Sequence, residues 1–337
     1  MTTPDAVTRV LRFTGIEPTQ IATRQTGYRN HSYRATLADG RFVNLIMYKR
    51  EPGIIGRIRR ANAVSDFLAA RGMPTRVTLS PAVIRLHAST YSRYAALYSY
   101  LPGMTIPWEA YTHRHLTLLG ETMSNMHAQL AAFPNSSLIS EASNAVTEHR
   151  LLVERMSRYF KEGGVTRSAR NRLGLAIKPS LFTRFDTVLS ATDRLQHQQA
   201  LHMDFVRGNL LFDTRDGNLV VSGILDFEKT SFGHPILDVA RTLAFLLVDS
   251  KYKTEVHVRK YFLQSGYGKR GQHPFKAIRI TQGNHTLNLL DELTNMFLFH
   301  DFYKFLRHNP YESLQANEHY VRTFQYLSRR GLLTQLR

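Results

Sequence analysis

The segment from His202 to Asp213 constrains this chain more than any other. It places a carboxylate at Asp204 and, after four intervening residues, a carboxamide at Asn209. The apolar residues behind Asn209 predict a buried strand, and a Gly-Asn pair then predicts a turn. A second apolar run, Leu219 to Leu225, is rich in β-branched residues and ends at Asp226. The spacing therefore predicts a β-hairpin with Asp204, Asn209 and Asp226 at one end.

Three segments together resemble the aminoglycoside phosphotransferase and choline kinase family of small-molecule kinases. They are His202-x-Asp204-x4-Asn209, Ile224-Leu225-Asp226-Phe227-Glu228 and Gly233-His234-Pro235-x-x-Asp238-x-Ala240. An Asp-x4-Asn pattern alone is common by chance, so the ordered set carries the resemblance. It extends loosely from about Arg24 to the C-terminus. One departure is Met203, because the family usually has Gly there.

The resemblance implies an α+β, two-lobed, protein-kinase-like fold. A small β-rich N-terminal lobe, residues 1–100, would bind the nucleotide, and a large, mainly helical C-terminal lobe, residues 101–337, would carry catalysis and the substrate site. The implied reaction moves the γ-phosphoryl group of ATP, or of GTP, to a hydroxyl of a small molecule such as an aminoglycoside, an amino alcohol or a sugar. The alternative is a catalytically degenerate kinase-fold protein that binds nucleotide or a partner.

The resemblance also implies catalytic roles. In kinases an Asp orients the attacking hydroxyl and accepts its proton, while an Asn and a second Asp hold Mg²⁺ against the phosphates. These roles fall to Asp204, to Asn209 and to Asp226, of which the last two are the metal ligands. Glu228 is a lesser candidate for contact with substrate or metal. Arg207 would neutralise the transferring phosphoryl group or pair with a substrate carboxylate.

Two further residues of these motifs are expected to support the loop. A His two residues before a catalytic Asp more often holds the loop by hydrogen bonding than transfers protons, so we expect His202 to be structural. Asp238 follows Pro235, which is typical of a first helical turn. We expect Asp238 to brace the catalytic loop from that helix.

The small lobe is predicted to be strand-rich from Ile21 to Tyr48, with a turn at Asp39-Gly40. It has no glycine-rich phosphate loop. By resemblance, Asn30, His31 and Ser32 would offer hydrogen-bond donors to phosphate in place of glycines. A plain β-hairpin is the alternative interpretation of this segment.

The segment Leu101-Pro102-Gly103 resembles the hinge between the lobes of such kinases. Backbone groups of Ser99, Tyr100 and Leu101 would hold the base of the nucleotide. Tyr98 and Tyr100 would flank the base, although aromatic residues in a strand more often belong to the core.

A lysine and a glutamate that kinases use to grip the α- and β-phosphates are missing from the expected places. Alignment puts Ile46, or Leu45 with a shift of one residue, where the Lys should be, and Ala61 where the Glu should be. No acidic residue occurs from Pro52 to Ser65. Either a substitute cation binds the phosphates, or the protein is a degenerate kinase. The candidates for that substitute are Lys49, Arg57, Arg59 and Arg60.

Apolar periodicity predicts the helices of the chain. They span residues 5–14, 57–71, 116–132, 151–160, 179–195, 235–250, 287–307 and 312–327. Residues 264–285 are rich in Gly, His and Lys and predict a long loop or a poorly ordered insertion. The carboxylates Asp291, Glu292 and Asp301 either line an acceptor site for substrate amino groups or form surface ion pairs.

The composition limits the remaining classes. The chain has 337 residues, no cysteine and a net charge of +18. It lacks a signal-peptide pattern and any apolar run of membrane-spanning length, which favours a soluble, cytoplasmic protein without a membrane partner. The positive charge is spread along the chain, which favours a solvated basic surface over a specific nucleic-acid site. We expect a monomer or a dimer.

Overall fold

The computed structural model describes most of the chain, in two compact units. It describes residues 4–23, 25–26, 30–80, 83–87, 92–134, 143–161, 175–268, 275–282, 285–308 and 317–335. The first unit comprises Met1–Thr105 and Gly208–Thr230, and the second comprises Ile106–Arg207 and Ser231–Arg337. Gly27 to Arg29 of the expected nucleotide loop lie outside the described residues.

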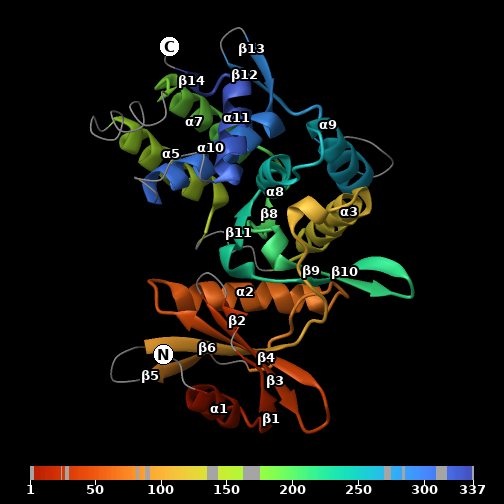
Figure 1. Ribbon diagram of the computed structural model, residues 1–337. Coiled ribbons are helices and arrows are strands. Elements are labelled where there is room, and N and C mark those ends of the chain that lie inside the picture. The colour runs from red at the N-terminus through yellow and green to blue at the C-terminus, as the bar shows by residue number, and fades with distance from the viewer. Residues whose placement is uncertain are drawn as a thin grey trace. The chain divides into compact units, whose positions relative to one another are not determined.

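The first unit is built on an antiparallel sheet (Figure 1). The strand order is β1-β3-β4-β6-β5, and the short β2 also pairs with β3. The strands are β1 (Pro18–Ile21), β2 (Gln25–Thr26), β3 (His31–Leu37), β4 (Phe42–Lys49), β5 (Ile84–His87) and β6 (Ser92–Ser99). The predicted strands between Ile21 and Tyr48 are thus confirmed.

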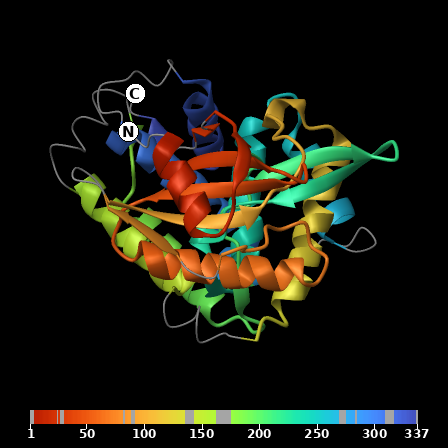
Figure 2. The ribbon, with the colours of Figure 1, turned by 90° about the horizontal axis from the view of Figure 1, so that it is seen from below.

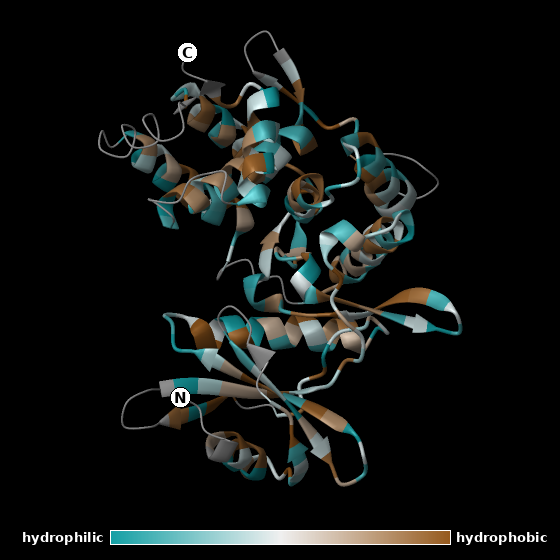
Figure 3. Cartoon of the chain, in the orientation of Figure 1, coloured by the Kyte–Doolittle hydropathy of each residue, from teal (hydrophilic) through white to brown (hydrophobic). Residues whose placement is uncertain are grey.

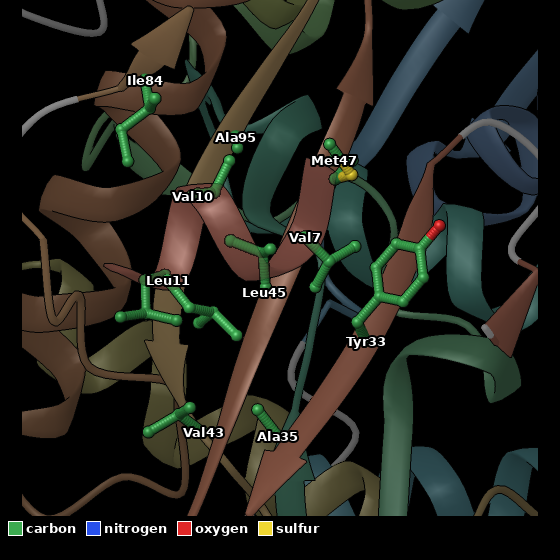
Figure 4. Packing of buried hydrophobic residues seen from close by; sticks show 11 residues of the cluster. Val7, Val10, Leu11, Tyr33, Ala35, Val43, Leu45, Met47, Ile84 and Ala95 are labelled. Atoms are coloured by element: carbon green, nitrogen blue, oxygen red, sulfur yellow. The ribbon is translucent and has the colours of Figure 1, made fainter. Parts of the chain in front are cut away.

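Two helices cover opposite faces of this sheet (Figures 1 and 2). Side chains of a strand alternate between its faces. On β4, Leu45 and Met47 therefore pack with α1 (Pro4–Phe13), as Figure 4 shows. The residues between and after them, Ile46 and Tyr48, pack with α2 (Ile54–Ala69).

The hairpin predicted from the sequence is present as β9 (Leu210–Arg215) and β10 (Asn218–Ile224). It packs within the first unit, although the predicted boundary at residue 100 had assigned it to the second lobe. The reason is backbone pairing. Met104 and Phe212 exchange two hydrogen bonds of 3.0 and 2.9 Å, and the Ile224 N–H donates to the Pro74 carbonyl oxygen at 2.7 Å.

The second unit is mainly helical. Its helices are η1 (Trp108–Ala110), α3 (His113–Leu130), α5 (Ala145–Lys161), α7 (Ser180–Asp193), α8 (Ile236–Asp249), α9 (Glu255–Val258), η4 (Arg259–Tyr267), α10 (Leu289–His308) and α11 (Glu318–Arg329). Short strand pairs join β8 (Gln199–Leu201) to β11 (Ser231–Gly233), β12 (Arg279–Gln282) to β13 (His285–Asn288), and β7 (Leu175–Ala176) to β14 (Thr334–Gln335).

Helix α8 forms the centre of this unit. It buries eleven of its fourteen residues, and Figure 3 shows hydrophobic residues around its turns. It packs against α10 and α11. The predicted architecture, a β-rich N-terminal part and a mainly helical C-terminal part, is confirmed.

The prediction of a long loop over residues 264–285 is wrong for the described part of that range. Helix η4 continues to Tyr267, because Phe262 and Leu263 are fully buried and hold it in the core. Strands β12 and β13 then form a short hairpin. Among the described residues, no helix is long and apolar enough to cross a membrane.

Candidate active site

The catalytic loop predicted at His202 to Asp204 is held by Asp238 of α8. The Asp238 carboxylate accepts the backbone N–H of His202 at 2.8 Å and that of Met203 at 2.6 Å. His202 is fully buried, and its Nδ1 accepts the backbone N–H of Asp204 at 3.1 Å. Both side chains therefore shape the loop, in the supporting roles that the sequence predicted for them.

The backbone at Met203 has the conformation that favours the glycine expected there from the resemblance. Met203 has φ = 57°, in the left-handed region that glycine adopts without strain. The two hydrogen bonds to Asp238 hold the loop in this conformation. The Met203 side chain is buried, so its packing offsets part of the strain.

A buried network fixes Asp238 in turn. His127 Nε2 lies 3.0 Å from Asp238 Oδ2, and His127 Nδ1 lies 2.8 Å from the Tyr267 hydroxyl. Burial acts to raise the pKa of Asp238, but the hydrogen bond and charge of His127 and the His202 backbone N–H outweigh it. The pKa of Asp238 is therefore lowered, which keeps the brace ionised. His127 is thus a buried core residue with a partner within hydrogen-bonding distance of each ring nitrogen.

The side chain of Asp204 has an ion-pair partner that sequence reasoning missed. Arg241 Nη2 lies 3.2 Å from Asp204 Oδ1, and both side chains are largely buried. Arg241 follows Asp238 by three residues on α8, so both point to the same side of the helix. The i, i+3 spacing of Asp238 and Arg241 was the available signal.

The other two predicted catalytic residues lie in the first unit, at a pocket of about 320 Å³. Its floor includes the start and the end of the β9–β10 hairpin. The lining residues are Asn30, Ser32, Ile46, Tyr48, Ala61, Asn62, Ser65, Arg76, Tyr98, Gly208, Asn209, Ile224, Leu225, Asp226, Phe227 and Glu228. Asn209 and Asp226 are thus brought together, as the hairpin spacing predicted.

The backbone around Asp226 is held by local hydrogen bonds. The Leu225 N–H donates to the Asn209 carbonyl oxygen at 2.8 Å, which ties the two ends of the hairpin. Asp226 has φ = 60°, an uncommon value for a residue other than glycine. Its Oδ1 accepts the Glu228 N–H at 3.3 Å and so begins the short helix η3 (Phe227–Lys229), which packs on α2.

The donors at this pocket fit a magnesium ion. Mg²⁺ prefers oxygen ligands and usually takes one or two from carboxylates, completing its shell with substrate phosphates and water. Asn209 and Asp226 supply a carboxamide oxygen and a carboxylate, and the exposed Asp226 has no ion-pair partner within 4.0 Å among the described residues. Among the same residues, no group of three or more His, Asp or Glu side chains is placed to hold a metal ion, so they form no dedicated all-protein metal cage.

The structure separates the predicted phosphate-loop residues. Asn30 and Ser32 line the pocket, and the Asn30 carboxamide donates to Glu228 Oε1 at 2.6 Å. His31 begins β3 and does not line it. Lys49 is exposed at the end of β4 and belongs to the strand face of Leu45 and Met47, which faces α1. Its side chain therefore does not line the pocket.

The predicted hinge residues lie at the end of β6, whose last residue is Ser99. The Ser99 N–H donates to the Val77 carbonyl oxygen at 2.8 Å, and Ser99 Oγ accepts the Val77 N–H at 2.9 Å. Tyr100 and Leu101 are partly buried, and the Tyr100 ring lies 5.5 Å from that of Phe42. None of the three lines the pocket, whereas Tyr98, just before them, does.

A neutral network occupies the place of the expected Lys–Glu pair. Ile46 lines the pocket and Leu45 does not, which favours the register that puts Ile46 at the lysine position. Ala61 also lines the pocket. Beside them the Tyr48 and Tyr98 hydroxyls lie 2.7 Å apart, and Tyr98 donates to Asn62 Oδ1 at 2.8 Å. Burial raises the pKa of both phenols, that of Tyr98 to about 12.

The carboxylates near the last helices already have partners. Glu292 forms a bidentate pair with Arg184, and Asp291 Oδ1 lies 2.7 Å from Arg259. Asp301 Oδ2 lies 2.5 Å from His319 Nε2. The structure therefore favours the ion-pair interpretation of these residues over an acceptor site for amino groups, because each charge is compensated within the protein.

Comparison with known proteins agrees with this architecture. A model of the phosphotransferase enzyme family, APH, matches residues 20–263. Hydroxylysine kinase from Mus musculus is 24% identical over 231 residues, which are 59% of this chain and 55% of that protein. The chain thus matches about half the length of this curated relative.

Solved structures show the same fold at low sequence identity. Amicoumacin kinase hAmiN in complex with AMP-PNP, Ca²⁺ and Ami superposes with a TM-score of 0.66 at 13% identity, covering 96% of this chain and 93% of that one. A ternary complex of a thermostable mutant of aminoglycoside phosphotransferase APH(4)-Ia with AMP-PNP and hygromycin B gives 0.62 at 13% identity, covering 97% and 99%. The predicted protein-kinase-like fold is therefore confirmed.

The match to the family model includes the hairpin, the loop at His202 and the brace at Asp238. It covers well over half of the chain, and it confirms the resemblance to small-molecule kinases that the motifs indicated. The chain belongs to the phosphotransferase enzyme family.

Proposed function

We propose that this protein transfers the γ-phosphoryl group of ATP, or of GTP, to a hydroxyl group of a small molecule in a Mg²⁺-dependent reaction. The observation that carries the proposal is the pocket of the first unit, which gathers Asn209 and Asp226 from the two ends of one hairpin. Membership of a phosphotransferase family and the fold shared with nucleotide-bound kinases support it.

The proposed roles are those that the resemblance to kinases implies for these residues, and the local geometry supports them. Asn209 and Asp226 would hold Mg²⁺, which would neutralise charge on the transferring phosphoryl group. Asp204 orients the acceptor hydroxyl and takes its proton. Arg241 fixes the Asp204 side chain through the 3.2 Å contact, and Asp238 fixes its backbone through the loop. In such sites most of the rate comes from positioning and charge compensation.

The acceptor is proposed to be an amino alcohol, an aminoglycoside-like compound or a sugar. Support comes from the names of similar proteins, which include hydroxylysine kinase and the kanamycin complex of an aminoglycoside phosphotransferase. We propose that the protein acts in the cytoplasm as a monomer or a dimer.

The test is a phosphoryl-transfer screen with ATP or GTP and Mg²⁺. Hydroxylysine, ethanolamine, choline, kanamycin, hygromycin B and simple sugars serve as acceptors, and the phosphorylated product is detected by mass spectrometry. We expect one acceptor class to be phosphorylated. Transfer to none of them, with no nucleotide binding in calorimetry, would refute the proposed function.

Matched variants test the roles. Asp204→Asn should lower turnover by about 10²- to 10⁴-fold while ATP binding is retained, because Asp204 acts on the hydroxyl. Asp226→Ala should remove the dependence of ATP binding on Mg²⁺. Asp216→Asn, at the exposed turn of the same hairpin, removes an equal charge and should change neither. An Asp204→Asn variant that keeps most of the turnover of the unaltered protein would contradict the role proposed for Asp204.

A further inference from the structure

Arg76 is a cation at the nucleotide pocket that no motif of the sequence pointed to. It follows α2 in a short extended segment where Val77 and Leu79 are exposed. Because side chains alternate along an extended backbone, Arg76 points inward, and it lines the pocket together with Asn209 and Asp226.

The backbone on both sides of Arg76 is firmly held within the first unit. Ser65 Oγ of α2 donates to the Arg76 carbonyl oxygen at 2.6 Å, and Thr75 Oγ1 donates to the Ser65 carbonyl oxygen at 2.7 Å. Thr75 is also bridged to Ile224 of β10, two residues before Asp226. The segment thus ties α2 to the hairpin, and it fixes where the Arg76 side chain enters the pocket.

The Arg76 guanidinium has little compensation from the protein. Among the described residues no carboxylate lies within 4.0 Å of it, and its Nε is buried without a hydrogen-bond partner. Nη2 donates to Asn44 Oδ1 at 3.1 Å when the carboxamide is oriented to satisfy its neighbours, and the guanidinium carbon lies 5.9 Å from the Tyr98 ring centre. Burial lowers the pKa of Arg76, yet a guanidinium stays charged in proteins.

An unpaired charge of this kind is unfavourable unless an anion completes the site. Isolated buried charges carry a large desolvation penalty. The neighbouring hydroxyls of Tyr48 and Tyr98 are neutral and are satisfied by each other and by Asn62, so they form no ion pair with Arg76. The Asp226 carboxylate attracts the guanidinium only from beyond 4.0 Å. A guanidinium has a planar fork of donors that matches phosphate oxygens.

We propose that Arg76 binds the α- or β-phosphate of the nucleotide and takes the part that a strand lysine plays in other kinases. The geometry favours it over Lys49, Arg57, Arg59 and Arg60, none of which lines the pocket. The cation thus comes from the segment that follows α2. It lies on the side of the sheet that α2 covers, whereas Lys49 belongs to the opposite face of β4. This inference rests on the proposed use of a nucleotide.

The test is calorimetric binding of MgATP, MgADP and adenosine to the full-length protein. Arg76→Gln should weaken MgATP and MgADP binding by more than about tenfold, which corresponds to about 1.4 kcal/mol, and leave adenosine binding within about twofold. Arg76→Lys keeps the charge but loses the fork, so it should recover part of the loss. Arg71→Gln removes the same charge from the exposed turn just after α2 and should change none of the three affinities.

The outcomes separate the two proposals. If the unaltered protein binds MgATP and Arg76→Gln binds it equally well, Arg76 is not the phosphate ligand, and the proposed function stands. If Arg76→Gln weakens adenosine and MgATP alike, with a lowered Tm, the role of Arg76 is structural and the inference is refuted. If the unaltered protein binds no nucleotide, the proposed function fails, and the role of Arg76 fails with it.

Discussion

At the scale of single residues, Met203 shows a conflict between backbone and side chain. The loop requires φ = 57° there, while the side chain is buried with 3% of its surface exposed. In this left-handed region of φ, a residue other than glycine has a conformational free energy higher by about 1 kcal/mol or more. The loop keeps this conformation because Asp238 accepts both adjacent N–H groups.

A pair of substitutions separates these two contributions. Met203→Gly and Met203→Ala both remove the side chain, but only glycine relieves the backbone. We expect the Gly variant to be more stable than the Ala variant by about 1 kcal/mol in denaturant unfolding. The same pair at Met123, buried in α3, should show the opposite order, because glycine destabilises helix interiors by about 1 kcal/mol. If the Ala variant is more stable than the Gly variant at both sites, Met203 is unstrained.

The residues that sequence reasoning found and missed differ in one physical respect. Asp204, Asn209 and Asp226 stand in a fixed spacing set by one loop and one hairpin, so a local pattern indicates them. Arg76 reaches the pocket through the packing of the segment that follows α2, and Arg241 reaches Asp204 through the packing of α8. The i, i+3 spacing to Asp238 is a local signal for Arg241, whereas no periodic spacing marks Arg76, and the four candidate cations all precede it in the sequence.

At the scale of elements, His319 joins three helices. Its Nδ1 lies 2.5 Å from Asp249 at the end of α8, and its Nε2 lies 2.5 Å from Asp301 of α10, while His319 itself belongs to α11. Burial acts to lower the pKa of His319, but the two carboxylates outweigh it and raise the pKa to about 10. The charged imidazole therefore stabilises the packing of these helices.

This linkage predicts a pH dependence of stability. A histidine with a raised folded pKa contributes its full stabilisation below the unfolded value of 6.5 and loses it as the pH rises to about 10. His319→Gln should lower Tm at pH 6 by roughly 4 to 8 °C, or about 2 kcal/mol, and by much less at pH 10. His308→Gln, at the exposed end of α10, is the control. A difference that stays constant from pH 6 to pH 10 would contradict the linkage.

Helices could be predicted from the sequence where apolar residues recur with strong helical periodicity. They could not be predicted where a high content of Gly, His and Lys indicated a loop. The spacing in α3 and α8 gave helices within a few residues of the observed ones. Helix α2 begins at Ile54, three residues earlier than predicted. The residue before it, Gly53, is the N-cap and has φ = 71°. Residues 264–267 are helical although they include a glycine, because they continue η4, whose residues Phe262 and Leu263 are buried just before them.

At the scale of the whole molecule, the first unit is discontinuous in sequence. The sequence boundary at residue 100 follows the order of the chain, whereas the hairpin at 208–230 returns to pair with Thr75 and Met104. Pairing between segments more than a hundred residues apart leaves no mark on local composition. The pocket is therefore assembled from three stretches, residues 30–48, 61–98 and 208–228.

Amide hydrogen exchange can test whether these stretches act as one binding site. Adding MgATP should slow exchange in all three together, at Ile46 to Tyr48, at Ser65 to Arg76 and at Ile224 to Glu228, because a ligand stabilises every backbone segment that it holds in place. Helix α5 lies in the other unit and supplies the control segment, whose exchange should stay unchanged. Protection limited to residues before 105, with the hairpin unaffected, would show that nucleotide binding does not involve Asp226. In that case the metal role assigned to the hairpin would fail, and the phosphates would depend on Arg76 and the strands alone.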